Sequence, residues 1–174
     1  MIAPKLIIAG VEIALQTFPT SQGYSRVDGG SVLHRMLNGA GLPQEHWSKL
    51  AFSIAGDGWA PPALAGVDWS AAVEIACIAP RAIHSATVNA TLPAARRTDL
   101  TATPNVYCRA VVAGELVETP VSVLVNAATA TAVAGATSYQ FYYYPKLSCW
   151  SRGPSESLDL SGAAYAWSLE AEEV

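Results

Sequence analysis

The sequence predicts an all-β fold: a single-domain antiparallel β-sandwich or barrel that spans residues 1–174. Apolar and polar residues alternate with period two in many short segments, which is typical of half-buried strands. Glycine and proline residues separate these segments, and no long stretch follows the 3.6-residue period of an amphipathic helix. Because a domain usually has about 100–200 residues, 174 residues correspond to one domain.

The N-terminal half contains short strand-like segments that end at turn residues. Lys5–Ala9 is an apolar run that ends at Gly10, and a second strand follows it, in which Val11, Ile13 and Leu15 alternate with polar or small residues. Further strands are expected at Ser31–Leu37, which ends at the turn dipeptide Asn38–Gly39, at His46–Ala55, at Val73–Cys77 and at Ile83–Leu92, where the chain continues or bends.

The C-terminal half contains the clearest hairpin signal. Val106–Val112 and Leu116–Val125 flank the short glycine-containing loop Ala113–Gly114–Glu115, which has hairpin length. The last two strands are expected at Ser138–Tyr144 and Ala163–Glu172. Two long loops complete the chain: Gly56–Trp69, in which Pro61–Leu64 could form one helical turn, and Ser151–Ser161.

Composition excludes several classes of protein. Hydrophobic residues make up 51% of the chain and charged residues only 14%, with a net charge of −4, so the chain is not disordered. Arg96–Arg97 is the only basic doublet, which argues against sequence-independent binding of nucleic acid. The uncharged stretch Thr119–Tyr144 contains Pro120 and alternating hydrophobic residues, so it predicts strands and no membrane insertion. Sparse charge indicates a surface largely covered by other protein.

The sequence shows no catalytic or metal-binding pattern. The cysteines Cys77, Cys108 and Cys149 lie far apart, without CxxC spacing, and are expected to be buried as small hydrophobic residues. The three histidines lack HExxH spacing, and neither a nucleophile elbow nor a phosphate-binding loop is present. Asp57 and Asp68 are interpreted as turn residues. We therefore expect no enzymatic activity, no cofactor and no metal.

Aromatic residues are the best candidates for a functional surface. Tryptophans occur in or beside loops, and three consecutive tyrosines must place rings on both faces of one strand. Such rings anchor protein–protein contacts, stack on carbohydrates or pack in the core, and the sequence leaves these readings open. The candidates for inter-subunit contacts are Trp59, Trp69, Tyr142, Tyr143, Tyr144 and Trp150.

Two segments carry a resemblance to a known class of protein. Between Trp47 and Ile83, a strand that begins with tryptophan leads into G-x-G-W-x-P-P-x-L-x-G-V-D-W-S and then into an apolar strand that ends in A-P-R. From Tyr139 to the C-terminus, Y-Y-P is followed by P-S-E-S and by a Y-A-W strand with an acidic end. Both segments resemble small virion structural proteins of long-tailed bacteriophages, encoded among the tail-tip or baseplate genes.

The resemblance implies a β-rich subunit without cofactor or catalysis. Such a subunit is made in the bacterial cytoplasm and resides in the virion tail, where copies form a ring that joins the tail tube to the hub beside other tail and baseplate proteins. A tail-tube or tail-terminator subunit would also form a ring. Tube subunits usually have a long hairpin that pairs with the neighbouring subunit, and Val106–Val125 is the candidate for it in this sequence. From a different class, a carbohydrate-binding module for host recognition would use Trp59, Trp69 and Trp150.

Overall fold

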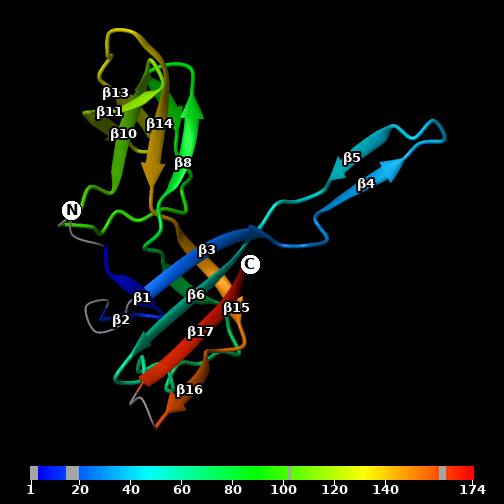
Figure 1. Cartoon of the computed structure of the whole chain (residues 1–174), viewed down its shortest axis with the longest axis vertical. Helices are drawn as coiled ribbons and strands as arrows, with labels where there is room; N and C mark the ends of the chain where they lie inside the picture. The colour runs from blue at the N-terminus through cyan, green and yellow to red at the C-terminus, as the bar shows by residue number, and fades with distance from the viewer. Residues whose placement is uncertain (1–3, 15–19, 102, 161–163) are drawn as a thin grey trace. The chain divides into compact units, whose positions relative to one another are not determined.

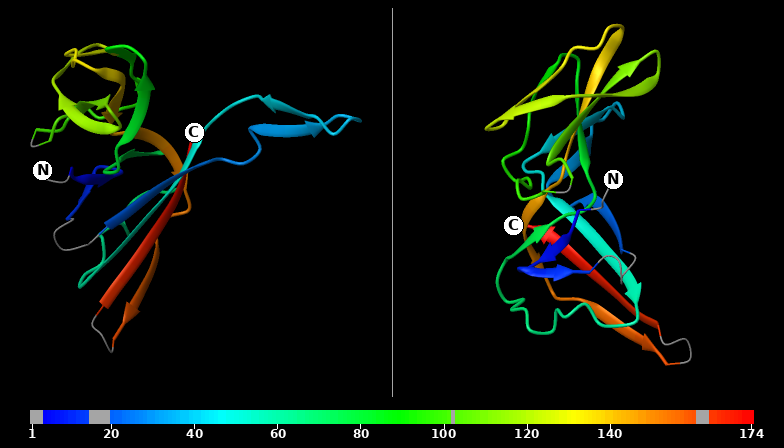
Figure 2. Two further views of the ribbon diagram at one scale, coloured as in Figure 1. Left: turned by 45° about the horizontal axis from the view of Figure 1, so that its top comes forward. Right: turned by 90° about the vertical axis from the view of Figure 1, so that its left-hand side faces the viewer.

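The computed structural model describes residues 4–14, 20–101, 103–160 and 164–174 and contains seventeen strands and no helix in those ranges (Figure 1). The predicted all-β, antiparallel fold is confirmed, although its sheets do not close into a barrel. The chain packs as two compact units (Figure 2). The first unit comprises residues 1–6 and 76–147, and the second comprises residues 7–75 and 148–174.

An eight-stranded sheet organises the second unit, in the order β2-β1-β7-β15-β17-β6-β3 with β16 also paired to β17. Its strands are β1 (Leu6–Ile8), β2 (Val11–Ile13), β3 (Thr20–Arg26), β6 (Leu50–Gly58), β7 (Val73–Ala76), β15 (Lys146–Ser151), β16 (Ser155–Asp159) and β17 (Ala164–Glu173). The central strand, β17, pairs with β6 along almost its whole length.

The other edge of β17 is shared by two strands. Trp150 and Ser151 of β15 pair with Glu172 and Ala171, and β16 resumes the pairing where Ser155 meets Ser168. Three residues, 152–154, thus lie opposite only two residues of β17, which is the residue count of a β-bulge. The bulge interrupts the ladder and opens the sheet locally.

The two faces of this sheet differ in side-chain size and polarity. Phe52 and Ile54 of β6 and Trp167 and Leu169 of β17 are buried on the inner face. Trp167 lies opposite Gly56 in the register, and a Cβ built on Gly56 would lie 2.8 Å from Trp167 Nε1. Glycine is therefore required at this position, because only its missing side chain leaves room for the indole ring.

Gly56→Ala should destabilise the protein by about 1–3 kcal/mol, because the buried indole must shift to admit the methyl group. Gly66→Ala is the matched control, because a Cβ at Gly66 meets nothing within 4 Å, while both substitutions restrict the unfolded chain equally. Urea unfolding followed by circular dichroism measures the difference, and equal midpoints for the two variants would contradict this packing.

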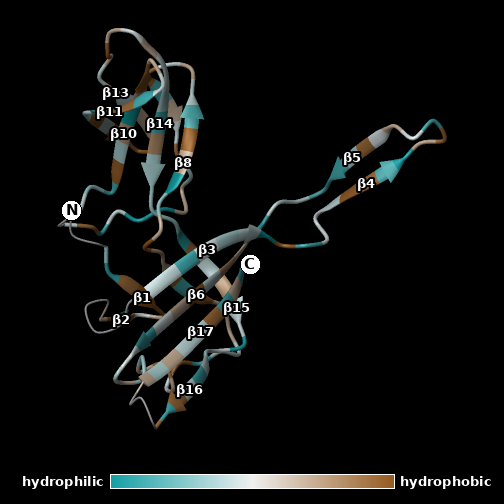
Figure 3. Ribbon diagram, in the orientation of Figure 1, coloured by the Kyte–Doolittle hydropathy of each residue, from teal (hydrophilic) through white to brown (hydrophobic). Residues whose placement is uncertain are grey.

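The second unit also contains a two-stranded hairpin, which we call the arm: β4 (Ser31–Arg35) and β5 (Gly41–Glu45). The predicted Asn38–Gly39 turn closes it, with Gly39 at a φ of 80° and Met36 N donating to Ala40 O. In Figure 1 the arm extends beyond β3 and β6, and Figure 3 shows hydrophobic segments along it. Every residue of both strands is exposed.

Two smaller sheets form the first unit. One has the order β11-β10-β14-β8 and the other β12-β13-β9. Residues of both sheets, among them Cys108, Phe141 and Ala128, pack into one hydrophobic core. The strands are β8 (Arg81–Ser85), β9 (Asn89–Thr91), β10 (Val106–Val112), β11 (Glu115–Thr119), β12 (Val121–Leu124), β13 (Ala127–Ala130) and β14 (Ala136–Tyr143).

Several predicted segments end elsewhere than expected. Leu116–Val125 is two strands in different sheets, because Pro120 breaks the β11 ladder and its carbonyl accepts from Thr131 N instead. Ile83–Leu92 bends after Ser85, whose hydroxyl donates to Asn89 O at 2.7 Å. The expected loop Ser151–Ser161 contains a strand, β16, which is stabilised by pairing with β17. The loop expected at Gly56–Trp69 begins later, because β6 continues to Gly58, and Pro61–Leu64 forms no helical turn.

A buried arginine joins separate segments of the first unit. Arg97, 1% exposed, is the one charged side chain buried among the described residues. Its guanidinium donates to the carbonyl oxygens of Lys5 and Cys77 and forms a fork with the Asp99 carboxylate, at 3.1 and 2.8 Å. Its backbone N–H donates to Tyr144 O at 2.8 Å. The backbone and side chain of Arg97 together therefore join its own segment to three others, at Lys5, Cys77 and Tyr144.

Arg97→Met should lower the free energy of unfolding by about 3–5 kcal/mol, because it leaves buried carbonyl oxygens without their donor. Arg109→Met is the control, because Arg109 is a half-buried arginine of the same unit whose guanidinium lies beside two tyrosine rings. Loss of these contacts should cost about 1 kcal/mol or less. Chemical denaturation of both variants tests this role, and a similar small loss for both would refute it.

Acid should weaken the Arg97–Asp99 pair. Hydrogen bonds from Arg97 hold the pKa of Asp99 below its ordinary value of 3.8, against the opposing effect of burial. A carboxyl whose pKa is lowered by folding contributes its stabilisation above the ordinary pKa and loses it as the pH falls through the folded-state pKa. Below about pH 4, wild type should therefore lose more stability than Asp99→Asn, as measured by urea midpoints across the acid range. Parallel curves for the two proteins would contradict the assignment.

Candidate functional site

The structure separates the six aromatic candidates. Trp59, immediately after β6, is 77% exposed, and Trp150 on β15 is 46% exposed. Trp69 is half-buried and lies against Gly153, where a Cβ would approach its ring to 3.2 Å. These tryptophans belong to the second unit and the three tyrosines to the first. The six candidates therefore do not form one aromatic surface within a single unit.

Tyr142 and Tyr143 lie on opposite faces of β14, and Tyr144 follows the end of the strand. Tyr143 and Tyr144 are buried, 6% and 3% exposed, and so belong to the interior of the chain. Tyr142, on the face of β14 opposite Tyr143, stacks on Tyr107 of the neighbouring strand, with ring centroids 4.7 Å apart and planes 3° from parallel. Its hydroxyl donates to Gln140 Oε1 at 2.6 Å. This ring is thus largely engaged within its own sheet.

The Tyr107–Tyr142 pair is capped by a cation. Arg109 Cζ lies 5.7 Å from each ring centroid. Burial raises the pKa of Tyr107, so the phenol stays neutral beside the guanidinium. The arrangement is a cross-strand stack that stabilises the sheet, and it leaves little free ring surface for a ligand.

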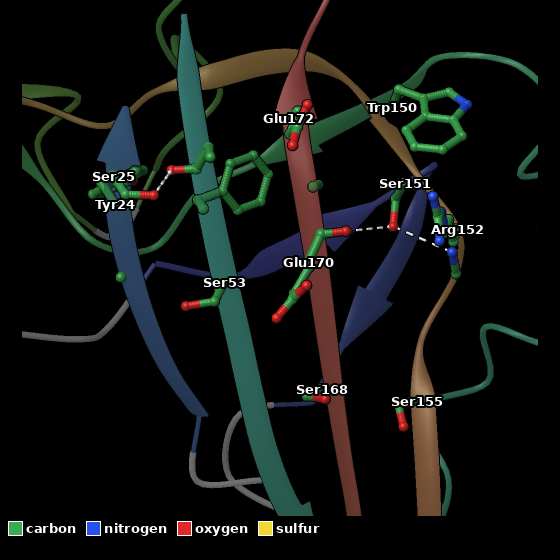
Figure 4. A pocket seen from close by; sticks show the side chains of 15 residues that line it. Tyr24, Ser25, Ser53, Trp150, Ser151, Arg152, Ser155, Ser168, Glu170 and Glu172 are labelled. Carbon is green, nitrogen blue, oxygen red and sulfur yellow. Dashed lines mark hydrogen bonds between the residues drawn. The ribbon is translucent and has the colours of Figure 1, made fainter. Parts of the chain in front are cut away.

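Trp150 lines a groove of about 980 Å³ on the outer face of β3, β6, β17 and the bulge (Figure 4). Glu170 and Glu172 of β17 line it, and Ser53 and Ser168 place hydroxyl groups on the same face. We call this cavity the outer groove.

The bulge shapes one wall of the outer groove. Ser151 Oγ donates to Glu170 O at 2.6 Å and accepts from Gly153 N at 3.2 Å, so one hydroxyl bridges the interrupted ladder. Gly153 adopts a φ of 92°, a conformation that favours glycine. The turn sets Arg152 beside Trp150, with its Cζ 5.8 Å from the indole centroid. Arg152 and the bulge therefore hold the indole of Trp150 at the rim of the outer groove.

The floor of the outer groove consists of small residues. Gly23, Ala51 and Ser53 occupy neighbouring positions on β3 and β6, and Ser168 continues the surface on β17. Small side chains keep the floor low, so the indole and the carboxylates stand above it. A shallow face of this kind offers contact surface and hydrogen-bond acceptors rather than an enclosed reaction chamber.

Groups associated with metal or covalent chemistry do not converge in the described ranges. No cluster of three or more His, Cys, Asp or Glu residues that could hold a metal ion occurs there. The three cysteines are buried, as expected, and none of them forms a disulfide in the described ranges; burial raises the pKa of Cys108. Asp68 accepts from Ser70 N and Oγ as a turn residue should, whereas Asp57 lies in β6 instead of a turn.

The arm is an exposed surface that contains none of the six aromatic candidates predicted from the sequence. Leu33 and Leu42 are each 54% exposed, and Leu37 at the tip is fully exposed. In the sequence, the expected strand Ser31–Leu37 and the Asn38–Gly39 turn together indicate this hairpin. Apolar residues stay exposed in a hairpin that packs against no other element. By contrast, the hairpin expected at Val106–Val125 lies within the first unit, where β10 is paired on both sides.

Comparisons with known proteins give no further guide. In the part of the chain that the structure describes, no helix is long and apolar enough to cross a membrane. No protein-family model, no curated protein and no solved structure matches the chain.

Proposed function

We propose that this protein is a structural subunit of a bacteriophage tail, which assembles into a ring at the tail tip or baseplate and links the tail tube to the hub. The sequence resemblance supplies the biological setting. The observation that carries the proposal is the arm, a two-stranded hairpin whose apolar side chains and outer edge are uncovered. A neighbouring copy supplies the missing cover.

The hydrogen-bond register identifies which edge of the arm is open. His46 N donates to Gly30 O and Met36 N donates to Ala40 O, so the hydrogen-bonded pairs fall on the even-numbered residues of β4. The backbone groups of Ser31, Leu33 and Arg35 consequently point away from β5. No described strand pairs with that edge.

The opposite edge of the arm is protected. Pro43 pairs with Leu33 in a non-hydrogen-bonded position, so the N–H that proline lacks would have pointed outward from β5. Proline on an edge strand discourages strand addition. The arm therefore offers only its β4 edge for pairing, which sets the direction in which a partner strand adds.

Exposed leucines supply the driving force for assembly. Burial of a leucine side chain contributes about 1.5–3 kcal/mol, and the arm exposes Leu33, Leu37 and Leu42. A contact made by an arm on a different surface of the next copy is head-to-tail, and such contacts generate a closed ring when their rotation closes. The low charged fraction of 14% fits a surface that neighbouring subunits cover.

A tail-tube or tail-terminator subunit is the alternative within the same class, because it would use the same arm. The two positions differ in location along the tail, not in the chemistry of the contact. Cryo-electron microscopy of particles that encode this chain distinguishes them by where its density lies, and its absence from the tail would refute both.

Substitution of two arm leucines by aspartate, L33D/L37D, should abolish self-assembly, because the charges cannot be buried in the contact. The loss should be at least about 3 kcal/mol, a hundredfold or more in the association constant, as measured by sedimentation velocity over a range of concentrations. L158D/L160D is the matched control, because these leucines are also exposed but lie outside the arm.

A second arm variant separates backbone pairing from apolar contact. Ser31→Pro removes one outward N–H of β4 without altering any leucine, and it should weaken assembly while the thermal transition stays unchanged. Assembly or incorporation into particles that is equal in wild type and L33D/L37D would contradict the role of the arm.

A further inference from the structure

We propose that the outer groove is a binding site for a neutral oligosaccharide, with Trp150 as the stacking platform and Glu170 and Glu172 as hydrogen-bond acceptors. This inference is independent of ring assembly, because the arm contributes no residue to the groove. The supporting observations are the exposed indole, the two carboxylates on one face of β17, the small-residue floor and the cavity volume.

The indole of Trp150 is available for stacking. It is 46% exposed at the rim of the groove, and Arg152 lies over its ring with Cζ at 5.8 Å from the centroid, which helps to hold its orientation. The C–H face of a pyranose ring is apolar, whereas the ring's edge carries hydroxyl groups. A rigid, amphipathic aromatic ring beside polar groups matches that division.

The carboxylates supply the complementary polar contacts. Glu170 and Glu172 lie two residues apart on β17, and so project from the same face into the groove (Figure 4). Neither forms a salt bridge with a residue in the described ranges. An ionised carboxylate only accepts hydrogen bonds, and the adjacent hydroxyl groups of a sugar donate them in pairs.

Charge and size narrow the class of ligand. The lining of the groove contains two carboxylates, Glu170 and Glu172, and one guanidinium, Arg152. Its net charge is therefore negative, which disfavours the binding of phosphate- or uronate-bearing polymers. The volume of about 980 Å³ lies at the upper end of the range of about 300–1,000 Å³ for small-ligand sites. The cavity is open and its floor is built from small residues, which suits several linked sugar units better than one enclosed ring.

Trp59 is the internal control for this assignment. It is more exposed than Trp150, at 77%, and belongs to the same unit, yet it does not line the groove. Stacking on an exposed indole alone would favour Trp59, whereas recognition by the whole groove requires Trp150. The two single substitutions therefore separate a built site from incidental aromatic adhesion.

The test uses the full-length protein on a printed array of neutral and anionic oligosaccharides, followed by isothermal titration with the hexasaccharide retained most strongly. We expect retention of neutral members, a loss of affinity of about tenfold or more for Trp150→Ala and no change for Trp59→Ala. Glu172→Gln, which keeps the shape of the side chain, should also weaken binding. Trp150→Phe keeps an aromatic ring and should retain most of the affinity, which guards against loss of folding in the alanine variant.

Three results would overturn the assignment. They are retention of no neutral oligosaccharide, retention of anionic members only, and equal affinity of wild type and a folded Trp150→Ala variant. Sedimentation velocity on Trp150→Ala should show the same assembly as wild type. A protein that assembles but binds no sugar thus refutes only the saccharide site, whereas one that binds sugar but never assembles refutes only the ring.

Discussion

The two-sided pairing of β17 is the constraint on which the second unit depends. One edge is continuous with β6, and the other is divided between β15 and β16 by the bulge at residues 152–154. Because a strand presents alternate residues to opposite faces, this ladder buries Trp167 and Leu169 while it presents Ser168 and Glu170 outward. The inner core and the outer groove are therefore two consequences of the same register.

A second kind of constraint holds the first unit. There the hydrophobic core joins two small sheets, but the connecting segments converge on Arg97, whose guanidinium has five donors in a rigid fork. A chain with only 14% charged residues thus places one cation beside two backbone carbonyl groups, those of Lys5 and Cys77, which would otherwise lack this donor. Apolar burial organises the sheets, and one buried cation connects the segments that lie outside them.

The two proposals assign different physical roles to different surfaces of the second unit. The arm has apolar side chains and an open backbone edge, which are properties of a protein–protein contact. The outer groove has carboxylates, hydroxyl groups and one indole over a low floor, which are properties of a polar ligand site. A tail subunit that carries both would join its neighbours through one surface and contact a glycan through the other.

The sequence by itself determined the all-β class, most strand positions, the turns at Asn38–Gly39 and Ala113–Gly114, and the burial of the cysteines, because alternation and turn residues act locally. Only the tertiary structure decided that β16 is a strand, that Tyr143 and Tyr144 are interior, and that Trp150 shares a groove with Glu170 and Glu172. These outcomes depend on pairing between segments distant in the sequence. Periodicity places a side chain on one face of a strand, but neighbouring strands decide whether that face is covered.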